Sequence, residues 1–135
     1  MSYYIKLYFA TLVVFFAVDM IWLGLVAREF YKKHLGYIMA PEVNWYAALI
    51  FYLLFIAGIL VFVVVPGLRT DGLTLMLLKA AFFGLITYAT YDLTNMATLK
   101  NWPLIVTVVD MIWGMVLTTL VSLGGYAAGK WLEKL

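Results

Sequence analysis

The sequence contains no cysteine and only one histidine, His34, which lies outside every long apolar run. The absence of cysteine excludes disulfides, thiol redox chemistry, thiolate metal sites and iron–sulfur clusters. One histidine cannot supply both axial ligands of a membrane-buried haem within a single chain. We therefore expect no haem, iron–sulfur or thiolate metal site, while other cofactors and metals stay open.

Charged residues are also scarce. They make up 12% of the 135 residues, whereas 67% are hydrophobic, and the mean hydropathy is +1.03. Soluble domains are about a quarter charged, so this is the composition of a membrane protein surrounded by the lipid bilayer. No basic cluster extends beyond Arg28, Lys32 and Lys33, so we expect no nucleic-acid partner. The length allows one domain, residues 1–135.

Four apolar segments are long enough to be transmembrane helices, because about 20 mostly apolar residues span a hydrocarbon core. They cover residues 7–27, 45–65, 73–99 and 103–128. Pro66-Gly67 is typical of a helix end, and Pro103 suits the first position of the fourth segment. Thr70 and Asp71 are candidate N-caps for the third segment. The sequence therefore predicts an all-α fold, an integral membrane four-helix bundle.

Residues 28–44 form the one long connection, amphipathic enough either to lie on the membrane surface or to extend the first helix. With four crossings, this connection and the third one share an end of the bundle, which we call the connection end. Both termini share the other, the terminal end. Aromatic residues at interface depth are typical of membrane anchors; here they are Tyr31, Tyr37, Trp45, Trp102 and Trp131.

The cationic residues divide almost evenly between the two ends. The terminal end carries Lys6, Arg69, Lys79, Lys130 and Lys134, and the connection end carries Arg28, Lys32, Lys33 and Lys100. This small excess favours cytoplasmic termini by the positive-inside rule. The near balance would also suit insertion in both orientations and an antiparallel homodimer.

Three carboxylates lie inside predicted spans: Asp19, Asp92 and Asp110. An ionisable residue at such depth costs several kcal/mol and needs an explanation. Asp92 and Asp110 are each displaced from the middle of their helix by about six residues, or roughly 9 Å, toward the connection end. Asp19 is displaced slightly in the same direction. We therefore expect all three carboxylates in one half of the membrane.

Helical spacing places polar and aromatic side chains beside these carboxylates. Residues on the carboxylate faces are Phe15 and Trp22 in the first span, Tyr88, Tyr91 and Asn95 in the third, and Thr107, Trp113 and Gly114 in the fourth. The second span has no comparable stripe and is expected to supply lipid-facing or packing surface. The pattern predicts a polar pocket among the first, third and fourth helices, open toward the connection end.

A buried aspartate is often only interhelical glue that hydrogen-bonds across a bundle. For each of these residues alone, that interpretation is as good as a functional one. Three clustered carboxylates cannot all be ionised in a low dielectric, so at least one is expected to hold a proton. Interhelical contacts rarely need three acidic residues, so the presence of three together favours a functional pocket.

A pentapeptide occurs twice. Residues 18–22 and residues 109–113 both read Val-Asp-Met-Ile-Trp, and they lie on spans expected to run antiparallel. An inverted repeat of this kind is the arrangement that many transporters use around a midplane site. Convergence on a useful Asp and Trp pair would give the same match, because the flanking residues barely agree.

The stretch from Tyr91 to Pro103 reads Tyr-Asp-Leu-Thr-Asn-Met-Ala-Thr-Leu-Lys-Asn-Trp-Pro. Together with Thr107, Asp110, Trp113, Gly114 and the segment from Asp19 to Trp22, it resembles the bacterial multi-pass membrane proteins grouped as domain of unknown function 2177. The resemblance covers essentially the whole chain. It implies a multi-pass protein of the bacterial inner (plasma) membrane, and it assigns no catalytic residue.

Three functions fit the predicted pocket. The first is a proton- or cation-coupled transporter or channel for a small solute, because intramembrane carboxylates that exchange protons couple such carriers. The second is binding or modification of a lipid, isoprenoid or pigment, with Mg²⁺ on Asp92, Asn95 and Asp110 as one possibility. The third is a structural or accessory membrane subunit. No enzyme motif is present, so we expect a non-enzymatic protein.

We choose the transporter interpretation. Its proposed proton- or cation-exchanging carboxylates are Asp19, Asp92 and Asp110. The residues expected to orient them or to form the walls of the pocket are Asn95, Tyr88, Tyr91, Trp22, Trp113 and Thr107. Aromatic rings among them could hold an organic cation through their faces.

Overall fold

The computed structural model describes residues 1–135, which form helices joined by short connections, with no strand. The all-α prediction is therefore confirmed. In chain order the helical elements, with η marking a π-helical turn, are α1 Ser2–Trp22, η1 Leu23–Ala27, α2 Arg28–Leu35, α3 Trp45–Ile59, η2 Leu60–Val64, η3 Gly67–Asp71, α4 Gly72–Thr98 and α5 Leu104–Leu132.

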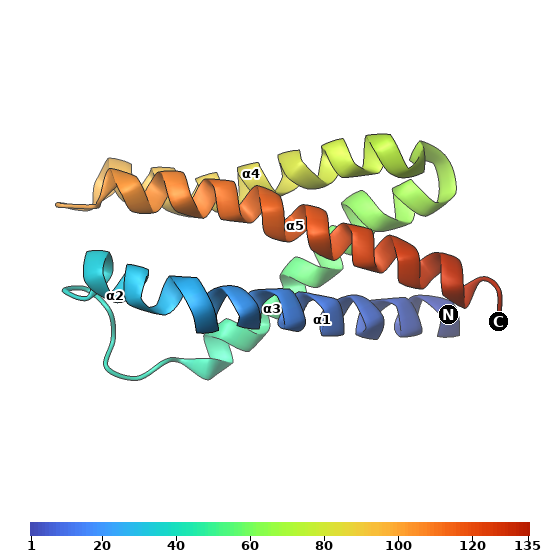
Figure 1. The fold of residues 1–135 in the computed structure, drawn as a ribbon, viewed down its shortest axis with the longest axis horizontal. Helices are drawn as coiled ribbons and strands as arrows, with labels where there is room; N and C mark the ends of the chain where they lie inside the picture. Colours follow the sequence, from blue (N-terminus) through green and yellow to red (C-terminus); the bar gives the residue numbers. More distant parts are fainter.

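Three continuous helical stretches are long and apolar enough to cross a membrane: Ser2–Leu35, Trp45–Thr98 and Leu104–Leu132. The first stretch contains the predicted span 7–27, and the last contains the predicted span 103–128 except for its first residue. The middle stretch contains the predicted span 45–65 and all but the last residue of the span 73–99. Within it the chain reverses direction between α3 and α4, so that α3 and α4 lie as two arms of a hairpin (Figure 1).

The hairpin turns at Gly72, not at the predicted helix end Pro66-Gly67. The helix continues through η3 to Asp71, and Gly72 then has a φ of +78°. Proline lacks an N–H and its ring crowds the preceding turn, but π-helical turns before and after Pro66 change the pattern of hydrogen-bond acceptors. The helix therefore passes the proline and reverses at the glycine, which tolerates positive φ.

The predicted N-caps of the third span have other partners. Asp71 precedes α4 but makes no capping hydrogen bond, and its carboxylate pairs with Lys79 instead. The Thr70 hydroxyl donates to the carbonyl oxygen of Pro66 at 3.2 Å. At the start of α5, Pro103 is the extended N-cap residue and Leu104 is the first helical one.

Of the two predicted arrangements for the first connection, the structure has the extended helix. η1 and α2 continue α1 to Leu35. Leu35 packs with Trp102 and Val106 in a small apolar cluster, which fixes α2 against the start of α5. The Tyr37 hydroxyl donates to the carbonyl oxygen of Asn101 at 2.6 Å, so the two connections meet over the connection end.

Helices α4 and α5 approach very closely at a pair of glycines. A Cβ atom added to Gly84 would lie 2.1 Å from the carbonyl oxygen of Gly114, which no side chain could tolerate. Small residues at such crossings let helix backbones touch and are common in membrane bundles. This contact fixes the relative position of α4 and α5, and therefore of Asp92 and Asp110.

The apolar core lies in the half of the molecule next to the termini. Its buried residues come from the start of α1, the end of α3 with η2 and η3, and the second half of α5: Leu7, Phe15, Phe55, Ile56, Ile59, Leu60, Val64, Leu68, Leu117 and Val121. The half next to the connection end has no comparable cluster. There the first residues of α3 diverge from α4 (Figure 1), and the buried carboxylates lie in this more open half.

Candidate functional site

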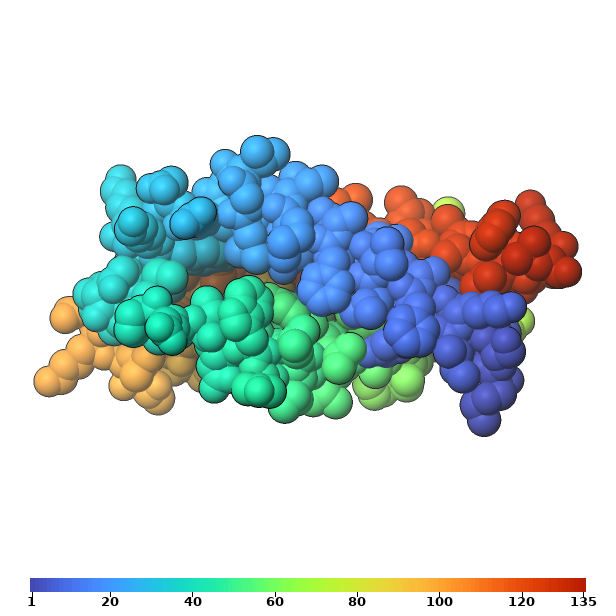
Figure 2. All heavy atoms as spheres, turned by 90° about the horizontal axis from the view of Figure 1, so that it is seen from below, coloured from blue at the N-terminus to red at the C-terminus, as the bar shows by residue number.

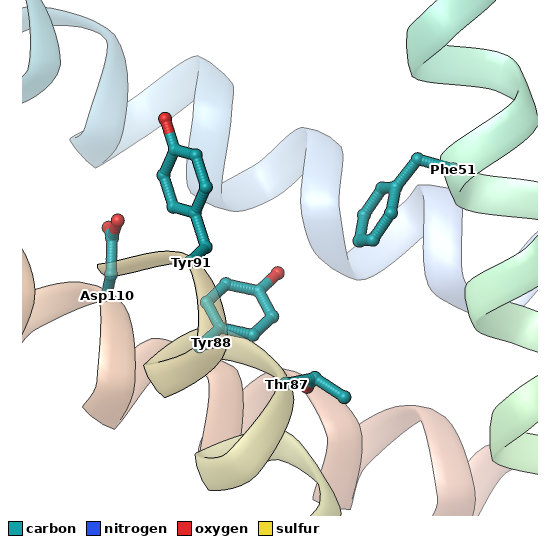
Figure 3. Close-up of a pocket in the computed structure, with 5 residues that line it drawn as sticks. All are labelled: Phe51, Thr87, Tyr88, Tyr91 and Asp110. Carbon is teal, nitrogen blue, oxygen red and sulfur yellow. The ribbon is translucent and has the colours of Figure 1, made fainter. Parts of the chain in front are cut away.

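Two adjoining cavities lie in the open half, and both are bordered by Phe51 of α3 and Tyr88 of α4. The first has a volume of about 340 Å³ and is lined by Phe51, Thr87, Tyr88, Tyr91 and Asp110 (Figure 3). The second has a volume of about 310 Å³ and is lined by Asp19, Trp22, Leu23, Tyr31, Ala48, Phe51, Tyr52, Tyr88 and Trp113. Every helical segment of the open half therefore contributes to one aromatic and acidic site.

The three aspartates are all buried, with exposed fractions of 6% for Asp19, 0% for Asp92 and 6% for Asp110. Tyr88 lines both cavities, with Asp110 in the first and Asp19 in the second, whereas Asp92 lines neither cavity and is a neighbour of Asp110. The clustering predicted from depth and helical phase is thus present in the fold. Their chemical role is a separate question, because burial alone would also suit interhelical glue.

Asp92 and Asp110 form a carboxyl pair between α4 and α5. Both oxygens of the Asp92 carboxylate are buried without any donor. The Asp110 carboxyl is a close neighbour of it, and two carboxyl groups can hydrogen-bond to each other only when one of them is protonated. Sharing one proton would satisfy both groups, as in other paired carboxylates.

Asp110 has a second partner, the hydroxyl of Tyr31, which donates a short hydrogen bond to Oδ1. The sequence predicts Tyr31 as an aromatic anchor at interface depth and does not predict its contact with Asp110. The π-helical turn η1 changes the helical phase between Trp22 and Tyr31, so a regular helical projection from Asp19 misses it. No simple sequence signal identifies this tyrosine.

Asp19 is buried and has neither a hydrogen-bond donor nor an ion-pair partner. The phenols of Tyr52 and Tyr88 lie near it. The ion pairs of the chain are Arg69–Glu133, Lys79–Asp71 and Lys130–Glu133, and all of them lie at the terminal end. No cationic side chain therefore compensates the buried carboxylates.

The indoles of Trp22 and Trp113 stack on each other, with ring centroids 4.4 Å apart and planes 9° from parallel. They end the two copies of the repeated pentapeptide, on α1 and α5, which run antiparallel (Figure 1). Asp19 and Asp110, from the same two copies, line the second and the first cavity. The repeat therefore contributes equivalent residues to a single site.

The other predicted residues lie at different distances from the cavities. Tyr91 lines the first cavity and is 57% exposed. Thr107 is buried below the site: its hydroxyl accepts from Trp102 Nε1 at 3.0 Å and donates to the backbone carbonyl of Asp92 at 3.5 Å. Asn95 is half-buried and lines neither cavity. Trp102, expected at interface depth, is 8% exposed.

The prediction that the second span supplies only lipid-facing or packing surface is wrong. Ala48, Phe51 and Tyr52 of α3 all line the second cavity. Their signal in the sequence is hidden, because two aromatic residues and an alanine do not stand out in an apolar helix. The pocket is therefore formed by helices from all four predicted spans.

The site opens sideways and not toward the connection end as predicted. Figure 2 shows a hollow on the side of the molecule, between α1–α2 in blue to cyan and α3 in teal to green. The connection end is covered by α2, by residues 36–44 and by the Tyr37 contact with Asn101. A helix continuing past the expected membrane boundary is the reason for this difference.

No group of three or more His, Cys, Asp or Glu side chains is arranged to hold a metal ion. Of the residues considered for Mg²⁺, Asn95 and Asp92 line neither cavity, and the Asp110 carboxyl already accepts a hydrogen bond from Tyr31. The donor set is therefore poor for a hard cation, which needs about six oxygen ligands.

The long apolar helices are those of a predicted membrane protein, and three carboxylates are buried among them. The chain belongs to the DUF2177 family, described as a predicted membrane protein, whose model matches residues 4–127. The family resemblance inferred from the helix signatures is thereby confirmed. No curated protein and no solved structure matches the chain.

Proposed function

We propose that the protein crosses the membrane four times, as a four-helix bundle, and is a proton- or cation-coupled transporter or channel for a small solute. The stretch Trp45–Thr98 has 54 residues. As one straight helix it would be roughly 80 Å long, far more than a bilayer core of about 30 Å. Its reversal at Gly72 supports two crossings, by α3 and α4.

We further propose the inner membrane of a bacterium as its location, with both termini in the cytoplasm. The terminal end carries one more cationic residue than the connection end, which favours this orientation by the positive-inside rule. The ion pairs at the terminal end are compatible with an aqueous surface there.

The observation that carries the transport proposal is the lack of any cationic partner for three buried carboxylates, of which Asp19 and Asp110 line the cavities. Interhelical glue would be expected to satisfy its polar atoms, yet Asp92 has no donor and Asp19 has no partner. Their charge must be neutralised by protons or by a bound cation. Exchange of one for the other is the elementary step of coupled transport.

The test is solute-linked proton movement in proteoliposomes that contain a pH-sensitive dye. Gradients of pH alone, NaCl, KCl and benzyltrimethylammonium chloride are imposed in turn, on wild type and on Asp19→Asn, Asp92→Asn and Asp110→Asn. Asp71→Asn is the matched control, because Asp71 is paired with Lys79 far from the cavities. We expect wild type and Asp71→Asn to move protons under at least one gradient and the three variants of the buried aspartates to match protein-free liposomes. Wild-type vesicles that match protein-free liposomes under every gradient would overturn the proposal.

A further inference from the structure

We propose that the two cavities bind a lipophilic organic cation, an ammonium group on a small apolar body, which enters sideways from the lipid between α1 and α3. The inference rests on the carboxylate pocket of the proposed function and names its substrate class. The ammonium pairs with Asp19 in the second cavity. The apolar body extends past Tyr88 and Phe51 toward the first.

The negative charge of the buried carboxylates indicates that the ligand is a cation. Asp19 is 6% exposed, lines the second cavity and has no partner in the chain. Asp92 and Asp110 can satisfy each other through one proton, and Tyr31 donates to Asp110 as well. Asp19 is thus the carboxylate with which a cationic ligand would pair, because a buried carboxylate left unpaired is costly.

The aromatic lining of the second cavity indicates which kind of cation fits there. Six aromatic side chains line the second cavity: Trp22, Tyr31, Phe51, Tyr52, Tyr88 and Trp113. Ring faces attract ammonium groups by their quadrupole and also accept apolar substituents. An inorganic cation would need several oxygen ligands, and no cluster of three acidic or histidine side chains provides them. The site therefore suits an organic cation better than a metal ion.

The position of the opening indicates the route by which the ligand enters. The hollow lies on the side of the molecule between α1–α2 and α3 (Figure 2). The helices that border it, α1 and α3, expose apolar side chains: Met20, Ile21 and Leu54 are all more than half exposed. A ligand reaching this opening comes from the lipid phase and must partition there.

An ammonium group could arrive on a free amine or as the headgroup of a phospholipid. A headgroup brings a phosphate with it, and no Lys or Arg lines either cavity to receive the phosphate. The cavities, at about 340 and 310 Å³, are at the small end of ligand pockets. Both features favour the free amine.

The test is binding of benzyltrimethylammonium to the full chain in phosphatidylglycerol nanodiscs, followed by tryptophan fluorescence, since Trp22 and Trp113 line the cavity. Neopentylbenzene, in which carbon replaces the charged nitrogen, is the neutral control. We expect a saturable change with the cation and none with the neutral isostere. Asp19→Asn should raise the half-saturating concentration by about tenfold or more, as loss of a buried charge partner does, whereas Asp19→Glu should retain binding.

Asp71→Asn should bind like wild type, because Asp71 lies outside both cavities. If Asp19→Asn fails to fold, Tyr52→Leu tests the same site. It removes an aromatic ring from the wall of the second cavity and should weaken binding several-fold. An equal response to the neutral isostere, or wild-type affinity in both variants, would overturn the inference. Repeating the titration in phosphatidylethanolamine distinguishes the sources: weaker binding there indicates competition by lipid headgroups, and equal binding indicates a free amine.

The two proposals fail in different ways. Proton movement driven by NaCl or KCl without benzyltrimethylammonium binding would leave the transport proposal standing and remove the organic cation. Saturable, Asp19-dependent binding without flux under any gradient would keep the binding site and remove transport.

Discussion

Trp22 and Trp113 stack with centroids 4.4 Å apart, and this contact joins the two copies of the pentapeptide across the antiparallel helices α1 and α5. Asp19 and Asp110 precede the two indoles by the same three positions. The repeat is therefore a spatial one, in which equivalent residues meet at the centre of the site. The two related carboxylates, Asp110 and Asp19, line the first and the second cavity.

The stacked pair should show measurable energetic coupling. In a double-mutant cycle with Trp22→Leu and Trp113→Leu, we expect a coupling energy of about 0.5–1.5 kcal/mol in the free energy of unfolding, as found for other aromatic pairs. Denaturation of the purified protein in mild detergent measures it. Trp45 and Trp131 are 65% and 61% exposed, and the same cycle on them should give no coupling; equal values for the two cycles would contradict the stacked geometry.

The glycine contact between α4 and α5 should be intolerant of any side chain. Gly84→Ala would place a Cβ atom 2.1 Å from the carbonyl oxygen of Gly114, so the helices must separate, at a cost of about 1–3 kcal/mol or more. The control is Gly24→Ala, where a Cβ atom would meet nothing within 4 Å. Thermal melts should show a large loss for Gly84→Ala and little change for Gly24→Ala. Equal melting temperatures would refute this packing.

Tyr31 should stabilise the fold through Asp110, because it is the one side-chain hydroxyl that donates to this carboxylate. Tyr31→Phe leaves a buried acceptor without its donor and should lower stability by about 1–3 kcal/mol. Tyr46→Phe is the matched control, since Tyr46 is 86% exposed. In an Asp110→Asn background the Tyr31→Phe effect should shrink. A Tyr31→Phe effect of unchanged size in that background would show that the two residues act independently.

Features that depend on local pattern could be predicted from the sequence. Hydropathy locates the apolar segments, and depth with helical phase groups Asp19, Asp92 and Asp110. The features that could not be predicted depend on irregular backbone or on tertiary packing. The π-helical turn η1 rotates Tyr31 into the site, and the divergence of α3 from α4 makes Phe51 and Tyr52 into cavity walls. Neither effect leaves a periodic signal in an apolar helix.

Asp92 separates the functional explanation of the carboxylates from interhelical glue. Its two oxygens are buried without a donor, so its carboxylate contributes no favourable hydrogen bond unless a proton is shared with Asp110. Asp92→Asn removes a buried ionisable group and introduces an amide that can donate to Asp110. We therefore expect the variant to keep or gain stability, by roughly 0–2 kcal/mol, while losing the proton movement of wild type.

The measurement pairs a thermal melt with the proteoliposome assay on the same preparation. Thr94→Val is the control on α4, because its exposed hydroxyl bonds only to its own helix, and both properties should stay near wild type. If Asp92 serves only as an interhelical contact, the opposite result is expected for Asp92→Asn. If the variant melts several degrees lower while its proton movement equals that of wild type, Asp92 serves packing, and the shared proton with Asp110 has no part in transport.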